Sequence, residues 1–346
     1  NLMGNKLSAR SLMEQSGVPV VPGCNDAISD EEQLYRIADE IGYPVLLKAS
    51  AGGGGKGMRR IYKREDLVAG WELTKREAKV SFANDDIYVE KLIENPRHIE
   101  IQILADSHGN VVYLPERDCS IQRNNQKIIE ESPSRANSEL LEKMYQSAVM
   151  CAKACGYEGT GTVEFIVDKY DNHYFMEMNT RIQVEYPVTE MVTGINLIKE
   201  QIRIASGLPL SVKQEDVVVN GHAIEIRVNA QNPYDDFRPS CGEISFFLPP
   251  GGLDTRFETA LYQGAKILPF YDSMMAKLIV KGSTRMDAIK KLRRAVSETI
   301  IDGVPTNLGF IYAILYDKDF ILGNIDTNYV AHKEAELLES MHVTGE

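Results

Sequence analysis

The chain has 346 residues, of which 43% are hydrophobic, and this length is typical of about two globular domains with at least one large core. Acidic residues outnumber basic ones by 50 to 38, and the net charge of −12 argues against a nucleic-acid binder with a broad basic surface. No apolar run approaches the roughly 18 residues that a membrane-spanning helix needs, which excludes an integral membrane protein.

The N-terminus and the cysteines bear on processing and location. The chain begins with Asn1, and residues 1–20 show no basic region followed by an apolar one. We therefore expect no signal peptide and interpret the chain as a fragment. The five cysteines are odd in number and scattered, which favours reduced thiols and a cytoplasmic protein.

The hydrophobic spacing predicts helices interspersed with strands, several of them in hairpins. Ser29 and Glu32 form a capping box for a helix that ends at Gly42. Alternating isoleucines over 98–105 predict a half-buried strand. This order indicates an α+β fold and not a doubly wound parallel sheet. The other expected helices are 6–16, 64–80, 138–155, 195–206, 284–299 and 329–340, and the other expected strands are 45–49, 58–62, 86–93, 111–114, 161–168, 173–179, 221–230, 243–248, 254–258 and 275–281.

A glycine-rich run, GGGGKG at 52–57, is the first candidate site. Four consecutive glycines cost backbone entropy, which favours a segment that approaches a ligand closely. The run is not a Walker A loop, because Gly57 follows Lys56 and strands flank it. Backbone N–H groups and Lys56 could instead cover phosphates, and the alternative is a disordered loop tip. Lys48 favours the phosphate site, because a lysine in an apolar strand usually has an anionic partner.

Two glutamates of a predicted hairpin form the second candidate site. If the turn lies at Tyr170 and Asp171, Glu164 and Glu177 face each other across the two arms. Like charges directly opposite destabilise a hairpin, so we expect a compensating cation. Magnesium suits carboxylates with a neutral oxygen such as that of Asn179. The alternative is one solvated glutamate and one in a salt bridge.

The segment MNTRIQVEYPVTE at 178–190 alternates polar and apolar residues. If it is extended, its polar side chains share the face that carries the second glutamate of the hairpin. A row of amide, guanidinium and carboxylate groups is atypical of a core strand, and a solvated edge is the alternative. The polar residues are Asn179, Arg181, Gln183 and Glu185.

Together these residues resemble the ATP-grasp and C-terminal domains of biotin carboxylase, the ATP-dependent component of biotin-dependent carboxylases. The resemblance covers nearly the whole chain in one order, and NTRIQVE with the downstream HAIEIRVNA distinguishes it from other ATP-grasp ligases. The matching stretches are MGNK (3–6), KASAGGGGKGM (48–58), VEKLIENPRHIEIQIL (89–104), ERDCSIQRNNQK (116–127), GTGTVEFIVD (159–168), MEMNTRIQVEYPVTEMVTGINLIKEQ (176–201), HAIEIRVNA (222–230) and YDSMMAKLI (271–279).

The resemblance implies an ATP-grasp fold followed by a biotin carboxylase C-terminal domain of antiparallel strands and helices. The family usually begins with a Rossmann-like domain, which is missing here. The implied parts are a linker helix from that domain at 1–20, the ATP-grasp lid with the Gly-rich loop at 21–93, the ATP-grasp core at 94–212 and the C-terminal domain at 213–346.

The resemblance also implies a reaction. Bicarbonate attacks the γ-phosphate of ATP to give carboxyphosphate, which releases CO2 beside biotin, and the ureido nitrogen of biotin captures it. The implied ligands are ATP, Mg²⁺ or Mn²⁺, and biotin on a carrier protein or domain. A carboxyltransferase is the further partner, and acetyl-CoA carboxylase of fatty acid synthesis is the expected complex. Family members are often homodimeric, and neither nucleic acid nor membrane is expected as a partner.

Site roles follow from the resemblance, position by position. Glu185 matches the general base that deprotonates bicarbonate, Arg227 the arginine that holds the biotin ureido oxygen, and Lys127 a lysine near bicarbonate and phosphate. The other matches are Lys6, Lys48, Gly53, Gly54, Gly55, Lys56 and Gly57 at the ATP phosphates; Glu90, Lys91 and Ile93 at the adenine hinge; Ile166 against the base; His98, Gln122 and Asn125 near ribose and phosphate; Glu164, Glu177 and Asn179 as metal ligands; and Arg181, Gln183, Val184 and Glu185 at bicarbonate.

The chain departs from the usual family pattern at two further positions. Asn125 stands where many members have His, and Tyr186 replaces the His that commonly follows QVE. Two alternatives to biotin carboxylation stay open: another ATP-grasp ligase, such as a carbamoyl-phosphate-synthetase-like half, and a truncated nucleotide-binding module without turnover.

Overall fold

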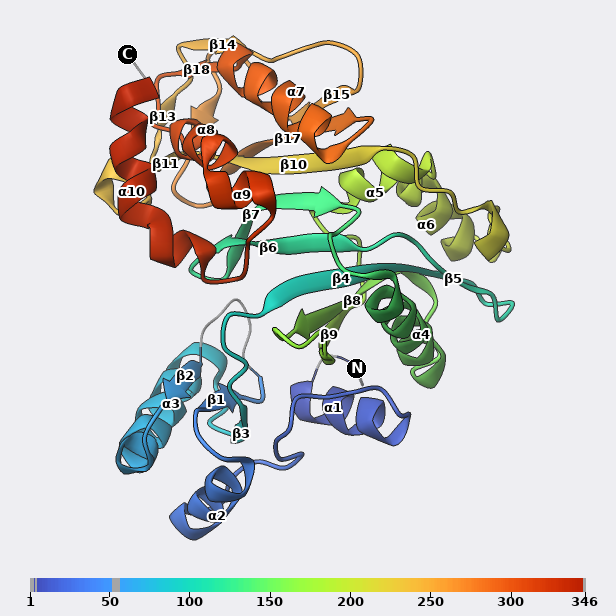
Figure 1. Cartoon of the computed structure of the whole chain (residues 1–346), viewed down its shortest axis with the longest axis vertical. Coiled ribbons are helices and arrows are strands. Elements are labelled where there is room, and N and C mark those ends of the chain that lie inside the picture. The colour runs from blue at the N-terminus through green and yellow to red at the C-terminus, as the bar shows by residue number, and fades with distance from the viewer. Residues whose placement is uncertain (1–2, 4, 52–56, 345–346) are drawn as a thin grey trace.

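The computed structural model describes residues 3, 5–51 and 57–344, and it confirms the expected α+β architecture (Figure 1). The helices are α1 Lys6–Gln15, α2 Glu31–Ile41, α3 Leu67–Phe82, α4 Ser138–Ala154, α5 Tyr186–Thr193, α6 Leu197–Ala205, α7 Arg285–Glu298, α8 Leu308–Tyr316, α9 Lys318–Leu322 and α10 Tyr329–Thr344. The strands are β1 Val45–Ala49, β2 Met58–Ile61, β3 Ile87–Lys91, β4 Arg97–Ala105, β5 Val111–Tyr113, β6 Arg117–Arg123, β7 Gln126–Ser132, β8 Gly159–Val167, β9 His173–Asn179, β10 His222–Asn229, β11 Gln231–Asn232, β12 Arg238–Pro239, β13 Gly242–Glu243, β14 Phe246–Leu248, β15 Thr255–Thr259, β16 Lys266–Ile267, β17 Met274–Gly282 and β18 Ile300–Asp302.

A small N-terminal sheet has the strand order β2-β1-β3, with α2 and α3 packed on it (Figure 1). Leu34 of α2 and Trp71 of α3 join Val45 and Leu47 of β1 in one apolar cluster. The start of α2 differs from the prediction by one residue. Its N-cap is Asp30, whose side chain accepts a hydrogen bond from the backbone N–H of Gln33, so the capping box predicted at Ser29 and Glu32 is wrong.

A larger antiparallel sheet contains nine strands of the described part of the chain. Its order is β15-β17-β10-β7-β6-β4-β8-β9, and β5 pairs with β4. The sheet crosses the predicted boundary between 212 and 213, because β10 pairs with β7 on one side and with β17 on the other. The two predicted parts therefore share one sheet, and residues from both of its halves can reach one site.

The two halves of this sheet have separate apolar clusters. Ile99, Ile101 and Ile103 of β4 pack with residues of α1, α4, β8 and β9. Ile224 and Ile226 of β10 pack with residues of β17, α7, α8 and α10. In both strands the isoleucines alternate with polar residues, so each strand presents its polar side chains to the opposite face of the sheet.

The prediction of a half-buried strand at 98–105 is wrong. Glu100 and Gln102 are both 0% exposed, because the polar face of β4 is covered by hydrogen-bonding side chains from other segments. The predicted isoleucine face is confirmed.

The prediction of an extended segment over 178–190 is also wrong. Strand β9 ends at Asn179, and α5 begins at Tyr186. Pro187 occupies the first turn of this helix, where its fixed φ and missing N–H are tolerated, and Gly194 ends it with a left-handed φ of 74°. The hydrophobic spacing also does not predict β6, β7, α8 or α9. Within the described residues, no helix has the length and apolar character to cross a membrane.

Candidate active site

Residues from both sheets line a cleft of about 1050 Å³. The small sheet contributes residues of β1, β2 and β3, the large sheet contributes residues of β4, β6 to β10 and β17, and the start of α10 also lines the cleft. The predicted site residues that line the cleft are Lys6, Lys48, Glu90, Lys91, Ile93, His98, Gln122, Asn125, Lys127, Glu164, Ile166, Glu177, Asn179, Arg181, Gln183, Val184, Glu185 and Arg227. The cleft thus brings together residues that lie up to 221 positions apart between Lys6 and Arg227.

The facing of the two glutamates is confirmed, but the register predicted from a turn at Tyr170 and Asp171 is wrong by one residue next to the turn, and a register shift after Glu164 compensates. Glu164 of β8 and Glu177 of β9 are register partners, and the side-chain amide of Asn179 donates to Glu164 at 2.9 Å and to Glu177 at 3.4 Å. Glu164 is almost fully buried, whereas the side chain of Glu177 is 39% exposed to the cleft. Two facing carboxylates and an amide form a hard oxygen-rich group that fits a magnesium ion.

Glu164 is held ionised by its neighbours. Burial opposes ionisation, but Lys127 at 3.2 Å and His98 at 3.1 Å outweigh it and hold the pKa of Glu164 well below its ordinary value. The side-chain amide of Gln183 also donates to Glu164, at 2.6 Å. A permanently charged carboxylate is what a divalent cation requires.

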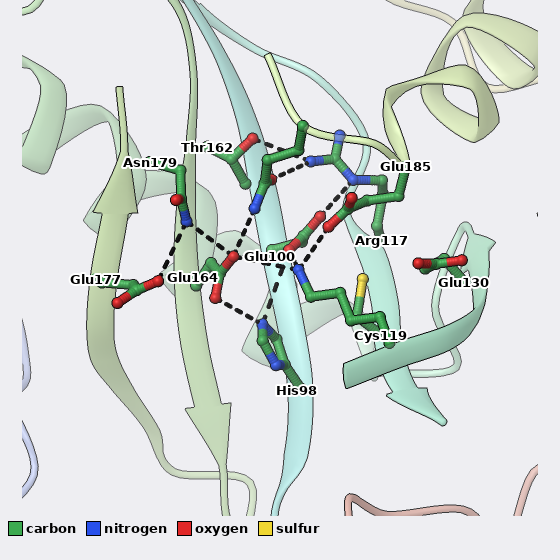
Figure 2. A network of polar contacts seen from close by, with 12 residues as sticks. His98, Glu100, Arg117, Cys119, Glu130, Thr162, Glu164, Glu177, Asn179 and Glu185 are labelled. Carbon is green, nitrogen blue, oxygen red and sulfur yellow. Dashed lines mark hydrogen bonds and ion pairs between the residues drawn. The ribbon is translucent and has the colours of Figure 1, made fainter. Parts of the chain in front are cut away.

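Lys127 of β7 contacts three buried carboxylates, those of Glu100, Glu164 and Glu185, which Figure 2 labels. Its Nζ lies 2.6 Å from Glu100, 3.2 Å from Glu164 and 2.5 Å from Glu185. Burial lowers the pKa of Lys127, but the surrounding carboxylates outweigh burial and raise it well above its ordinary value. Lys127 therefore keeps its charge and joins Glu164, a predicted metal ligand, to Glu185, the predicted general base.

Arg117 of β6, which no sequence pattern singles out, anchors the same network. Its guanidinium is 0% exposed and donates to Glu100 at 2.5 Å and to Gln183 at 2.9 Å (Figure 2). It also donates to three neutral side chains, those of Gln102, Thr162 and Thr189. The signal for Arg117 in the sequence is an arginine within the matching stretch ERDCSIQRNNQK, but its partners come from four distant segments.

Lys48 has the anionic partner that its strand position predicts, and this partner is Glu90. Lys48 of β1 lies 2.8 Å from Glu90 of β3, and both side chains are buried. Burial opposes the charge on Lys48, but Glu90 raises the pKa of Lys48 above its ordinary value. Lys6 lies 3.8 Å from Glu177, and burial followed by the charge of Lys48 lowers the pKa of Lys6.

Arg227 of β10 lies between two glutamates. Its Nε donates to Glu130 at 2.6 Å, and its terminal Nη2 donates to Glu185 at 3.0 Å. Burial and the negative charge of Glu100 both oppose ionisation of Glu185. The positive charges of Lys127 and Arg227 outweigh these two effects and lower the pKa of Glu185. Lys277 of β17 donates to the backbone carbonyl of Val184 at 2.7 Å, which ties the loop before α5 to the C-terminal strands.

Three predicted groups behave differently from the rest. Gly57 does not line the cleft; its N–H donates to Glu77, and a Cβ at this position would lie 2.9 Å from the Cβ of Ala49. Arg181 is exposed and donates to its neighbouring carbonyl, at Ile182. The remaining loop predictions, Gly53, Gly54, Gly55 and Lys56, lie outside the described residues.

Two family models match the chain. One, described as the ATP binding domain of the carbamoyl-phosphate synthase L chain, matches residues 5–213. The other, described as the biotin carboxylase C-terminal domain, matches residues 225–332. Biotin carboxylase 1 of Bacillus subtilis is 54% identical over 330 residues, which are 95% of this chain and 73% of that protein. One pyruvate carboxylase subunit of Methanothermobacter thermautotrophicus is 50% identical over 329 residues, which are 95% of this chain and 67% of that protein.

Solved structures agree with these matches. A biotin carboxylase from Campylobacter jejuni in complex with β-γ-ATP has a TM-score of 0.93 and 45% identity, over 96% of this chain and 74% of that chain. The biotin carboxylase domain dimer of 2-oxoglutarate carboxylase from Hydrogenobacter thermophilus has a TM-score of 0.94 and 47% identity, over 97% of this chain and 74% of that chain. That dimer was solved with MgADP, ADP and bicarbonate.

Proposed function

Because the chain belongs to the biotin carboxylase family, we propose that its cleft carboxylates biotin with bicarbonate at the expense of ATP, through carboxyphosphate. The observation that carries this proposal is the continuous chain of contacts from Glu164 through Lys127 and Glu185 to Arg227. A metal-site carboxylate, a predicted base and a predicted biotin arginine are thereby held within one connected network, as a reaction between three substrates requires.

The nucleotide end of the cleft carries the cations that phosphates need. Lys6 and Lys48 line it together with the exposed Arg181. Phosphoryl transfer concentrates negative charge on the transferring group, and positioned cations stabilise it without reorganisation. Magnesium, held by Glu164 and Glu177 with Asn179, would supply Lewis-acid neutralisation of the phosphate oxygens. The MgADP complex of the Hydrogenobacter relative supports the proposal that magnesium and an adenine nucleotide bind together.

The bicarbonate end is proposed to lie at Arg181, Gln183, Val184 and Glu185. A planar guanidinium such as that of Arg181 matches a planar oxyanion. Glu185 has a lowered pKa, so it is ionised at neutral pH and can accept the bicarbonate proton. Lys127 contacts one oxygen of this carboxylate at 2.5 Å and keeps the base oriented. The other oxygen of Glu185 accepts a hydrogen bond from Arg227.

Biotin is proposed to meet Arg227 beyond this base. An enolate that forms on the ureido group needs a fixed cation, and Arg227 extends from a strand whose neighbours hold it on both sides. Glu185, once protonated by bicarbonate, loses the charge that binds the outer nitrogen of Arg227. That nitrogen then becomes free for the ureido oxygen.

Release of ADP by the chain tests the proposal. We expect ADP release that requires MgATP and bicarbonate together and that increases when free biotin is added. The matched variant is Glu185→Gln, which keeps the shape but cannot take the proton; it should bind MgATP and lose the bicarbonate-dependent release. Biotin-independent turnover in the wild type would instead favour another ATP-grasp ligase. MgATP binding with no turnover would favour a nucleotide-binding module.

The acceptor and the partners are finer proposals. We propose a biotin carrier protein or domain and a carboxyltransferase as partners, in acetyl-CoA carboxylase of a cytoplasmic fatty acid synthesis pathway. The relatives named for pyruvate and 2-oxoglutarate carboxylases make those acceptors the competing ones. Transfer of labelled bicarbonate to acetyl-CoA, pyruvate or 2-oxoglutarate, with the matching carrier and carboxyltransferase supplied, distinguishes them.

A further inference from the structure

A pair of buried glutamates beneath Arg227 has no role in the chemistry above. Glu130 of β7 and Glu225 of β10 are register partners, and both are 0% exposed. The next pair along the ladder, Ile129 and Ile226, packs into the apolar cluster on the opposite face. Both carboxyl groups therefore lie on the face of the sheet that carries Arg227.

Like charges directly opposite each other on a ladder are destabilising, and the nearby cations offer the pair only one contact, that of Arg227 Nε with Glu130. Arg227 donates to Glu130 and to Glu185. Lys277, the register partner of Arg227 on β17, lies 2.8 Å from Glu258 and donates to a backbone carbonyl. A third nearby cation, Lys127, contacts Glu100, Glu164 and Glu185.

The carboxyl group of Glu225 makes no hydrogen bond with any of these cations. Across the described residues, neither of its carboxyl oxygens has a hydrogen-bond partner, and Oε2 of Glu130 has none either. An ionised carboxylate without partners in a buried site is so costly that the group takes up a proton instead. Burial, followed by the charge of Glu130, raises the pKa of Glu225 well above its ordinary value. Burial also raises the pKa of Glu130, to about 7.

We propose that Glu130 and Glu225 are positioning residues for Arg227 and hold one proton between them at neutral pH. With this proton bound, the pair carries a single negative charge. That charge binds Nε of Arg227 and turns the outer nitrogen of the guanidinium towards Glu185 and the cleft. A second negative charge would compete for the same guanidinium. The role in catalysis rests on the proposed function of Arg227, whereas the shared proton does not.

The titratable and charged groups that act on the pair come from β6, β7, β10 and β17 and from the start of α5. Burial makes the proton sensitive to each of their charges. These groups are Cys119 of β6, Lys127 of β7, Glu185 at the N-cap of α5, Arg227 of β10 and Lys277 of β17.

Infrared spectroscopy of the chain at pH 7 tests the proton without any substrate. A carboxylic acid and a carboxylate have separate stretching bands, and we expect an acid band in the wild type. The band should be lost in Glu225→Gln and retained in Glu139→Gln, a matched change at an exposed glutamate. An acid band of equal size in Glu225→Gln would overturn the shared proton.

The pH dependence of unfolding gives a second measure that tolerates a less stable variant. Glutamates of the unfolded chain release the proton that the native pair holds. The unfolding constant of the wild type should therefore rise between pH 6 and 8, by up to about tenfold per pH unit for each proton. The unfolding constant of Glu225→Gln should rise less over the same pH range. Parallel pH profiles of the two proteins would contradict the proposal.

Glu130→Gln tests the positioning of Arg227. Removing a charged hydrogen-bond partner should lower kcat for biotin-dependent ADP release by about 10- to 100-fold. The Kd for MgATP should not change, because Glu130 does not line the cleft. A kcat within twofold of the wild type would refute the positioning role. Absence of biotin-dependent turnover in the wild type would refute the proposed function instead, and the infrared and unfolding results would still decide the proton.

Discussion

Glu131 offers the most quantitative prediction, because its buried carboxylate joins three elements. It lies on β7 and is 3% exposed. Its carboxylate accepts hydrogen bonds from Arg285 of α7 at 2.6 and 3.0 Å, and lies 2.7 Å from Nε2 of His222 on β10. We expect Glu131→Gln to destabilise the packing of α7 against the large sheet.

The magnitude follows from the ionisation of this carboxyl group. Burial opposes ionisation, but His222 and Arg285 outweigh it and lower the pKa of Glu131 from 4.5 to about 2. This difference corresponds to roughly 3 kcal/mol of unfolding free energy. Removing one partner of a buried ion pair costs about 3–5 kcal/mol by a separate argument.

One neighbour reduces the expected loss. Asp118 is the register partner of Glu131 on β6, and burial, followed by the charge of Glu131, raises the pKa of Asp118 to about 6. Removing the charge of Glu131 relieves Asp118 of a repulsive neighbour. We therefore expect a net loss of about 2–3 kcal/mol at pH 7.

The sign of the pH dependence separates this reasoning from a simple packing defect. The pKa of Glu131 is lowered in the folded state, so its contribution is complete above pH 4.5 and is lost as the pH falls from 4.5 towards 2. Denaturant unfolding of the wild type and Glu131→Gln, measured from pH 7 to pH 3, should show two curves that converge at acid pH. Glu139→Gln, at an exposed pair, should change stability by under about 0.5 kcal/mol. A difference below about 1 kcal/mol at pH 7, or one that does not change with pH, would refute the argument.

Three further changes probe the cleft and its border. Glu177→Gln removes one of the facing carboxylates, so the magnesium concentration needed for half-maximal ATP binding should rise about tenfold or more. Calorimetric titration at several magnesium concentrations measures this, and an unchanged magnesium requirement would contradict the metal site. Arg227→Ala should retain MgATP binding and lose biotin-dependent ADP release, whereas the exposed control Arg294→Ala should keep both; unchanged biotin-dependent ADP release in Arg227→Ala would count against its role. Gly57→Ala should lower the melting temperature, because φ is +69° and the new Cβ would lie 2.9 Å from Ala49, at a cost of about 1 kcal/mol or more; a melting temperature equal to that of the wild type would show that the loop adapts.

The part of the site that depends on local pairing could be predicted from the sequence. Glu164 and Glu177 face each other as predicted, but the turn alone does not decide this: the pairs next to the turn, such as Ile166 and Tyr174, lie one residue out of the predicted register, and a register shift between Glu164 and Phe165 restores it. The alternating isoleucines of β4 likewise indicate which face enters the core. The prediction for β4 rests on the two-residue period of an uninterrupted strand.

The parts that depend on distant contacts could not be predicted in this way. Arg117 binds side chains that lie 15 to 72 positions away, and no spacing rule relates them. The polar face of β4 has the alternation of a solvated strand, yet Glu100 is fully buried because Arg117 and Lys127 cover it. The polar alternation of 178–185 suits a strand equally well, but β9 ends at Asn179 and a helix follows from Tyr186.

The register of the large sheet links the stability of the fold to the chemistry of the site. In β10, Ile224 and Ile226 enter the core, while Glu225 and Arg227 point to the opposite face with the cleft. A slip of one residue would exchange the two faces, so that buried charges would replace isoleucines in the core. The free energy of burying each isoleucine is on the order of 1.5–3 kcal/mol, and a slipped register would forfeit it. The apolar face therefore fixes the face that lines the cleft, because neither can move without the other.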